Sequence, residues 1–311
     1  MISYCKVVMY HYVRRIDKNQ FSNLKGLEVS SFKKQVKFFQ NNFTVINASQ
    51  FLDAIWKNVH LDKKSVLLTF DDGLKEHYLH VFPILKKLKI QGLFFSPIEP
   101  IEKKIVLDVH KLHFILAAIK NINDLVDEIF FFINKNREKY NLIPSESYFS
   151  RLAIKNRFDS KEIVFIKRIL QRELPVKLRK EIVQFLFSKY VTKNERKFSN
   201  DLYLSKNEIS EMVENGMYFG SHGYSHEWLT HLSNKKLNYE IEKSWNFWSK
   251  IKMNESRLIM CYPYGDYNEK IVSKIKKIGF KAGLTTKVGN AKLTKNQAFS
   301  LKRFDTNDFP Q

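Results

Sequence analysis

The sequence is poor in cysteine and has no long apolar run, and each of these shortages excludes a class of protein. Its 311 residues contain two cysteines, Cys5 and Cys261, too few for a disulfide framework and without zinc-ribbon spacing. The longest apolar stretches, such as Leu112–Ile119, reach about half of the ~18 residues that a membrane span needs. The first residues show no basic segment followed by an apolar core, so we expect no signal peptide and a cytoplasmic protein.

Acidic residues are also scarce relative to basic ones. Lysine and arginine number 53 against 32 aspartates and glutamates, which gives a net charge of +21. Such a charge suits nucleic acid, an anionic membrane face or a phosphate-bearing substrate. It also fits a plain compositional bias, because the lysines are scattered through the chain. Clustered basic residues with interleaved aromatics are missing, so we expect no nucleic-acid partner.

Strand-like and helix-like segments alternate in two parts of the chain. Continuous apolar runs and the residues that bound them predict strands at 7–10, 43–46, 65–70, 92–95, 217–220, 258–261 and 281–285. Helical spacing lies between them, with a serine N-cap expected at Ser30, a capping box at Ser205 and Glu208, and a helix end at Gly279. This alternation indicates a parallel sheet or a (β/α) barrel, an α/β fold.

The segment from about 101 to 201 has a different pattern. Residues 111–119, 123–134 and 161–171 have helical spacing, and glycine is almost missing. We interpret this segment as a large helical insertion within a single barrel domain that spans residues 1–311.

Four polar clusters each follow a predicted strand. They are His11, the pair Asp71-Asp72, the pair His222 and His226, and the segment 262–265. In a (β/α) barrel the carboxyl ends of the strands meet at one face, where catalytic groups gather. Taken alone, the Asp-Asp-Gly fits a simple turn and the two histidines fit an exposed loop. Their joint position favours a shared site.

These side chains are suited to metal-assisted hydrolysis. One aspartate and two histidines supply the three protein ligands of a catalytic zinc site and leave a position for water. The second, adjacent aspartate is then placed to accept a proton from that water.

Three segments resemble, in order, the first three motifs of the polysaccharide deacetylases (NodB homology, carbohydrate esterase family 4). They are Thr69-Phe-Asp-Asp-Gly73, Ser221-His-Gly-Tyr-Ser-His226 and Tyr262-Pro-Tyr-Gly265. The resemblance covers about Cys5–Leu93 and Leu202–Asp308, and it implies a distorted (β/α) barrel of about seven strands. It implies Asp71 as general base and a divalent metal, most commonly Zn²⁺. The implied metal ligands are Asp72, His222 and His226, and the implied oxyanion donor is the backbone N–H of Tyr264.

The sequence departs from that family pattern at three places. Gly223 stands where the family has Ser or Thr, and Tyr262 stands near the usual place of an arginine that pairs with the base. The late histidine that usually acts as general acid is missing, since the last histidine is His231. The segment Met9-Tyr-His11 resembles the first strand of the permuted poly-N-acetylglucosamine deacetylase branch. His11 is therefore the implied acid, expected across the metal from Asp71, and Arg303 in Leu301-Lys-Arg-Phe304 the implied partner of the base.

The resemblance implies a metal-dependent deacetylase that hydrolyses an N-acetyl group on a sugar of a glycan or glycan precursor. The alternatives are a deformylase or O-acetyl esterase acting on a similar sugar, and a non-catalytic basic binding protein. A nucleotide-linked or lipid-linked sugar carries phosphate, so its use as substrate would give the positive charge a purpose. We expect the protein in the cytoplasm or in peripheral contact with the anionic inner face of the membrane.

The remaining histidines and Trp228 receive weaker assignments. His77 and His80 are expected to be exposed or packed on a helix, and His231 to pack or cap. Trp228 suits either a sugar platform or the core, and Cys261 a structural thiol. His110 and His113, in the helical segment, are the reserve candidates for the acid.

Overall fold

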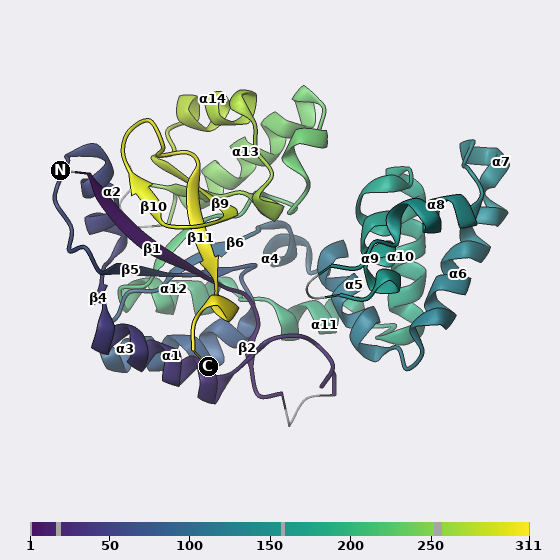
Figure 1. The fold of residues 1–311 in the computed structure, drawn as a ribbon, viewed down its shortest axis with the longest axis horizontal. Coiled ribbons are helices and arrows are strands. Elements are labelled where there is room, and N and C mark those ends of the chain that lie inside the picture. The colour runs from purple at the N-terminus through teal and green to yellow at the C-terminus, as the bar shows by residue number, and fades with distance from the viewer. Residues whose placement is uncertain (1, 17–19, 157–158, 252–256, 311) are drawn as a thin grey trace. The chain divides into compact units, whose positions relative to one another are not determined.

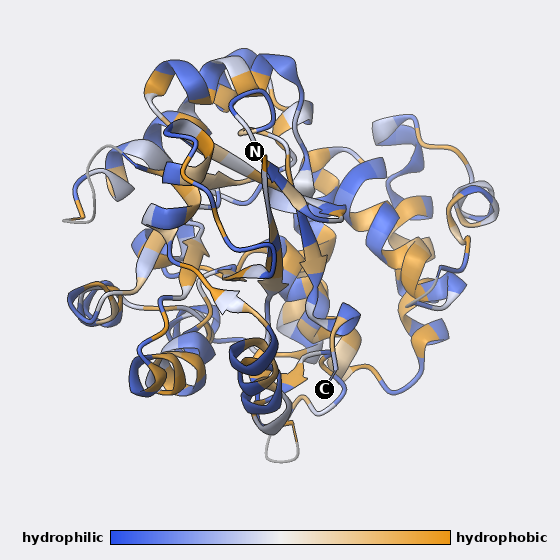
Figure 2. Cartoon of the chain, turned by 60° about the vertical axis from the view of Figure 1, so that its left-hand side comes forward, coloured by the Kyte–Doolittle hydropathy of each residue, from blue (hydrophilic) through white to orange (hydrophobic). Residues whose placement is uncertain are grey.

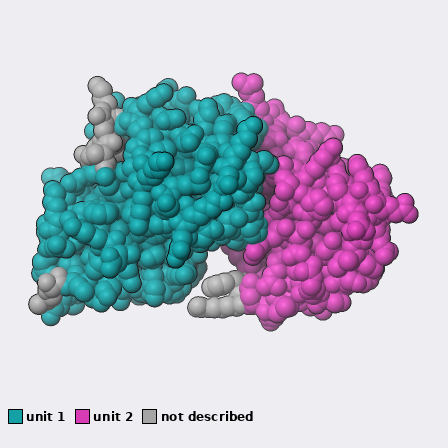
Figure 3. All heavy atoms as spheres, turned by 90° about the horizontal axis from the view of Figure 1, so that it is seen from above, with its two compact units in different colours: residues 1–15, 26–105, 199–311 teal, residues 16–25, 106–198 magenta. Residues whose placement is uncertain are grey.

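The computed structural model describes residues 2–16, 20–156, 159–251 and 257–310. The chain forms two compact units, which Figure 3 distinguishes by colour. The first unit comprises residues 1–15, 26–105 and 199–311, and the second comprises residues 16–25 and 106–198. The second unit thus takes a short N-terminal segment in addition to the region that the pattern marks as an insertion. The division into one barrel with an insertion at 101–201 stays a prediction.

A closed barrel of seven parallel strands forms the first unit (Figure 1). Around the ring the order is β1-β11-β9-β8-β7-β6-β5, and β5 pairs with β1 to close it. The N-terminal strand therefore lies between β5 and the last strand of the chain. The strands are β1 (Ser3–Tyr10), β5 (Ser65–Asp71), β6 (Leu93–Ser96), β7 (Tyr218–Ser221), β8 (Ile259–Cys261), β9 (Ala282–Val288) and β11 (Leu301–Asp305). The expected distorted (β/α) barrel is confirmed.

Four short strands in the described residues lie outside the seven-stranded ring. β10 (Ala291–Leu293) pairs antiparallel with β1, and β4 (Thr44–Val45) pairs parallel with β5. A separate pair is formed by β2 (Val13–Arg14) and β3 (Leu27–Glu28). The sequence pattern did not predict β2, β3, β10 or β11 as strands, because none of them is a long apolar run.

Helices connect the strands of the first unit and surround them (Figure 1). They are α1 (Val29–Asn42), α2 (Ala48–Trp56), α3 (Phe82–Leu88), α4 (Glu99–Lys103), α12 (Lys206–Glu214), α13 (Asn234–Trp248) and α14 (Glu269–Ile278). The capping box of Ser205 and Glu208 forms, and α14 ends at Gly279 with φ +121°. The expected serine cap of α1 is wrong, because the helix starts at Val29 and its N-cap is Glu28, two residues before Ser30.

A row of stacked aromatic rings joins the strands to the helices. Tyr10, Phe70, Phe94 and Phe219 are register partners on β1, β5, β6 and β7. Successive ring centroids in this row lie 5.0, 4.8 and 5.4 Å apart, and Trp248 of α13 stacks at its end, 5.5 Å from Phe219. Figure 2 shows the strands largely orange and the helices divided into orange and blue faces. The main apolar layer therefore lies between barrel and helices.

The pleat of β5 then decides where its polar residues point. Successive strand residues face opposite sides of a sheet. Because Phe70 faces the helices, its neighbours Thr69 and Asp71 face the barrel interior, where Arg303 of β11 contacts both. The strand that the apolar run predicts thus delivers a buried carboxylate to the inside of the barrel.

Helices make up the second unit. They are α5 (Asp108–Ala118), α6 (Ile122–Lys135), α7 (Arg137–Tyr140), α8 (Ser145–Leu152), α9 (Lys161–Arg168) and α10 (Val176–Tyr190), while α11 (Glu195–Leu202) contains the boundary between the units. Phenylalanines such as Phe165 and Phe187 form its core. His110 is fully buried on α5. Within the described residues, none of the helices of either unit combines the length and apolar character that crossing a membrane requires.

Candidate active site

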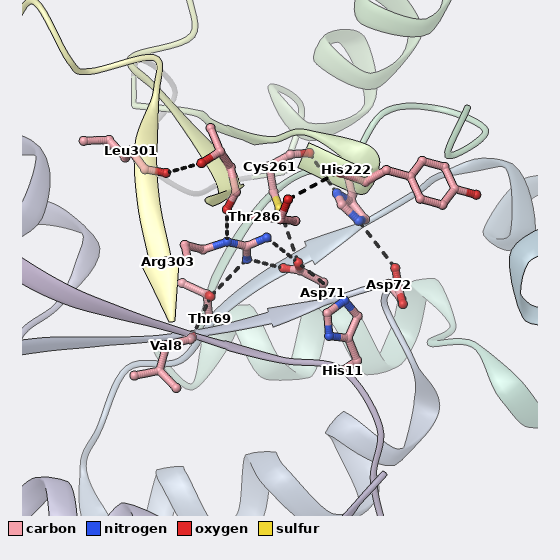
Figure 4. Close-up of polar contacts among 12 residues, drawn as sticks. Val8, His11, Thr69, Asp71, Asp72, His222, Cys261, Thr286, Leu301 and Arg303 are labelled. Atoms are coloured by element: carbon pink, nitrogen blue, oxygen red, sulfur yellow. Dashed lines mark hydrogen bonds and ion pairs between the residues drawn. The ribbon is translucent and has the colours of Figure 1, made fainter. Parts of the chain in front are cut away.

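The polar clusters lie at or just beyond the carboxyl ends of barrel strands, as the sequence predicts. His11 follows β1, Asp71 ends β5 and Asp72 comes next, and His222 follows β7 directly. Because these strands are parallel, their ends meet at one side of the ring. Figure 4 shows the side chains of this region turned toward one another.

Three side chains form a triangle of the size that a metal ion requires. The Nε2 atoms of His222 and His226 each lie 3.4 Å from Oδ1 of Asp72. A tetrahedral ion about 2.0–2.1 Å from each ligand would hold those atoms roughly 3.3 Å apart. All three residues are buried, and their ligand atoms lie within 4.8 Å of one another. Two imidazoles and one carboxylate are also the donor set of catalytic zinc sites, so the residues fit the expected metal.

A backbone hydrogen bond on the side away from Asp72 fixes the orientation of the His222 ring. Its Nδ1 lies 2.8 Å from the backbone carbonyl oxygen of Cys261, so Nδ1–H donates and the lone pair is left on Nε2, facing Asp72. A second potential metal-binding group consists of Asp71, His222 and the Cys261 thiol. We favour the first group, because both carboxylate oxygens of Asp71 already contact a guanidinium and Nε2 of His222 points to Asp72.

Arg303 pairs with Asp71 in the barrel interior. Its two terminal nitrogens donate to Oδ1 at 2.9 Å and Oδ2 at 2.7 Å of Asp71. Its Nε donates to the carbonyl of Thr285 at 2.9 Å, and both ionic side chains are about 1% exposed. Burial alone would raise the pKa of Asp71, but the Arg303 guanidinium, supported by His222, lowers that pKa to about 2. Asp71 is therefore ionised at every physiological pH.

His11 lies beside Asp71. Its Nε2 is 3.9 Å from Oδ2 of Asp71, and its side chain is 40% exposed. Its expected place across the metal from Asp71 stays a prediction. The imidazole therefore borders both the carboxylate and solvent. An acid at this place can exchange protons with water.

His77 supports the backbone of His11, a role that the sequence did not reveal. Its Nε2 lies 2.7 Å from the carbonyl oxygen of His11, and its ring contacts Phe70 and Phe94. Burial lowers the pKa of His77 to about 4, so the neutral ring donates this hydrogen bond at neutral pH. His77 begins a π-helical turn, His77–Val81, and such turns frequently accompany functional sites.

Tyr264 lies against the metal triangle. Its ring meets the His226 ring edge to face at 4.6 Å, and Trp228 stacks on it at 4.2 Å with a 2° interplanar angle. His231 stacks on Trp228 at 6.0 Å. Trp228 therefore packs between two rings, which favours the packing role over a sugar platform.

Backbone strain is concentrated at this site. Non-glycine residues with positive φ are costly, and they cluster where a structure imposes a function. In the described chain Lys89, Lys104 and Asn141 have this conformation as helix C-caps, and Asn58 follows another helix end. The remaining cases are Asp72 (+76°), His226 (+58°) and Tyr264 (+58°).

Comparison with known proteins identifies the family. The family model described as polysaccharide deacetylase matches residues 58–107 and 176–283, just over half of the chain. YxkH of Bacillus subtilis, which carries the name of a polysaccharide deacetylase, is 28% identical over 89 residues. Those residues are 29% of this chain and 32% of that protein, so the chain matches about a third of the relative's length.

Solved structures share the fold. The Streptococcus pyogenes deacetylase PplD, in complex with acetate, superposes with a TM-score of 0.59 at 16% identity, over 98% of this chain and 93% of that one. IcaB from Ammonifex degensii gives a TM-score of 0.56 at 16% identity, over 98% and 93%. The family match includes Asp71, Asp72 and the two triangle histidines but leaves His11 and Arg303 outside its range. Together with the barrel, it shows that the chain belongs to the polysaccharide deacetylase family.

Proposed function

We propose that the protein is a metal-dependent deacetylase that hydrolyses the N-acetyl group of a sugar in a glycan or glycan precursor. The observation that carries the proposal is the triangle of Asp72, His222 and His226 beside the Asp71–Arg303 pair. The proposed metal site and the ionised Asp71, which is not one of its ligands, therefore lie at the same end of the barrel.

Asp71 is the proposed general base. Arg303 holds both its oxygens, and Oδ2 also accepts from the Cys261 thiol at 3.4 Å, so Oδ1 is the oxygen left with a lone pair that can accept a proton from an attacking water. A carboxylate with so low a pKa is a weak base toward ordinary water. The bound metal would supply the missing acidity by polarising the water and the amide carbonyl. Asp72, His222 and His226 would hold that metal.

His11 and Tyr264 complete the proposed machinery. The tetrahedral intermediate of amide hydrolysis carries a negative oxygen, toward which the backbone N–H of Tyr264 is proposed to donate. The departing amine needs a proton, which we propose the partly exposed His11 imidazole gives. Arg303 is then a positioning residue, because it acts on the reaction through Asp71.

The substrate is proposed to carry phosphate, as nucleotide-linked and lipid-linked sugars do. The net charge of +21 favours an anionic substrate or an anionic membrane surface beside it. A location inside the cell stays a prediction of the sequence.

The test is release of acetate from a panel of N-acetylated sugars that are free, nucleotide-linked or lipid-linked. We expect acetate release that requires added Zn²⁺ and stops with a chelator. Release of formate from N-formylated sugars would favour the deformylase alternative, and activity restricted to O-acetyl sugars would favour the esterase. A protein that binds sugar or nucleic acid without hydrolysis under all metal conditions would overturn the proposal.

A further inference from the structure

Glu240 of α13 is a buried carboxylate that the proposed chemistry does not use. It is 5% exposed. Its Oε2 accepts hydrogen bonds from the backbone N–H groups of Tyr224 at 3.0 Å and Ser225 at 2.9 Å. Its Oε1 accepts a third from the Ser225 hydroxyl. All three donors belong to the segment that joins the two histidines of the metal triangle.

That segment needs support from outside, because its own backbone cannot provide it. Between His222 and His226 the chain turns through left-handed conformations at Gly223 (φ +73°) and His226 (φ +58°), so it forms no helix or strand. Backbone N–H groups that are buried without a partner destabilise a fold. Glu240 satisfies two successive N–H groups at the centre of this loop.

The loop is held on its other side by the backbone. The carbonyl oxygen of Tyr224 accepts from the N–H groups of Ile98 at 2.9 Å and Glu99 at 2.8 Å. The peptide group between Tyr224 and Ser225 is therefore fixed from both sides, by α13 and by the start of α4. Gly223 also packs closely here, since a Cβ at this position would lie 3.4 Å from Oε2 of Glu240.

A carboxylate suits this position better than an amide, because both of its oxygens accept hydrogen bonds. Burial raises the pKa of Glu240, and the hydrogen bonds from Ser225 and Tyr224 oppose that rise. The two histidine nitrogens must stay about 3.4 Å from the same aspartate oxygen for all three to reach one ion. Small rotations of the loop would change both distances together.

We propose that Glu240 is a positioning residue that holds His222 and His226 in the geometry for metal binding. The role rests on the metal site proposed above. The loop of a folded protein without this carboxylate samples other arrangements, and its affinity for a divalent ion falls.

The test compares Glu240→Ala and Glu240→Gln with Glu242→Gln, a matched control at an exposed position of the same helix. Zn²⁺ affinity is measured by competition with a chromophoric chelator, and thermal unfolding of the metal-free proteins is measured in parallel. We expect a 10–100-fold weaker affinity for Glu240→Ala, the range for partners that orient metal ligands. Glu240→Gln retains one acceptor oxygen and should lose less, and the control should match the wild type.

Activity at saturating Zn²⁺ gives a second measurement. A residue that acts only on metal geometry should show activity that recovers as Zn²⁺ is raised. Wild-type affinity in folded Glu240→Ala would overturn the role of Glu240. If that variant does not fold, wild-type affinity in Glu240→Gln would overturn it instead. A wild-type protein that binds no divalent metal would overturn the proposed metal site itself, so the two failures are distinguishable.

Discussion

In the barrel unit, buried charges converge on one end of the strands, whereas in the helical unit a buried charge such as Lys111 is paired within a core. Lys111 donates to Gln184 at 2.6 Å and lies 2.9 Å from Glu195. The strained backbone of the barrel unit includes Asp72 and His226, whereas in the described part of the helical unit Asn141 ends a helix. We therefore propose that similar burial serves catalysis in the barrel unit and stability in the helical unit.

The largest expected effect is the loss of metal and activity on replacing a histidine of the barrel unit, compared with a histidine of the helical unit. We expect His222→Ala to lose stoichiometric Zn²⁺ and nearly all hydrolysis, with its circular dichroism spectrum unchanged, because two ligands remain of three. His113→Ala in the helical unit should keep both metal and activity. Loss of turnover in His113→Ala would show that the helical unit contributes to the reaction.

The next effect concerns Asp71 and His11, the proposed base and acid, which are not proposed to bind the metal. We expect Asp71→Asn and His11→Ala each to lower kcat by about 10²–10⁴-fold while Zn²⁺ stoichiometry stays at the wild-type level. The KM of His11→Ala should change little, since the imidazole acts on charge that develops in the transition state. Steady-state kinetics with metal analysis provides the check, and unchanged turnover would place the base or the acid elsewhere.

A smaller effect is expected from the buried charge of the helical unit. Lys111→Met removes the partner of Glu195, which is 22% exposed and thus partly solvated. We expect the free energy of unfolding to fall by about 1–3 kcal/mol, which is below the range for breaking a fully buried pair. The kcat of the folded protein should stay at the wild-type value. Equilibrium denaturation beside kinetics tests this, and a fall in kcat without a fall in stability would contradict it.

An effect of similar size is a pH dependence within the barrel unit. The pKa of His77 is about 4 in the folded protein against 6.5 for an unperturbed histidine, so the unfolded chain binds the proton more readily. Its contribution to stability is complete above pH 6.5 and is lost as the pH falls toward 4. Between pH 8 and pH 5 the loss should be about 2 kcal/mol.

Replacing His77 by a group that does not titrate isolates this contribution. Denaturation curves of the wild type and of His77→Gln, which keeps a hydrogen-bond donor, should converge as the pH falls. Equal slopes against pH in the two proteins would show that His77 does not carry the dependence.

Strands formed by long apolar runs can be predicted from the sequence. Strands formed by short or irregular segments cannot. The run that ends at Phe70 predicts β5, and with it the burial of Asp71. The strand β11 escapes prediction because three of its five residues, Leu301–Asp305, are charged, although Arg303 itself is found through the family resemblance. His77 and Glu240 are missed for another reason. For His77, helical spacing does not show which face of the helix packs against the end of the barrel. For Glu240, a contact with a loop distant in sequence leaves no local pattern.

The order of strands in the barrel also bears on how the protein is made. β1 is the first barrel strand in the sequence and β11 is the last, yet β1 lies between β5 and β11 in the ring. Pairings of such long sequence separation form late and slowly. During translation the ring therefore stays open until β11 has left the ribosome, and the strand edges exposed until then favour aggregation. Because Arg303 arrives on that last strand, a nascent chain can gather Asp72, His222 and His226 before Asp71 has its guanidinium partner.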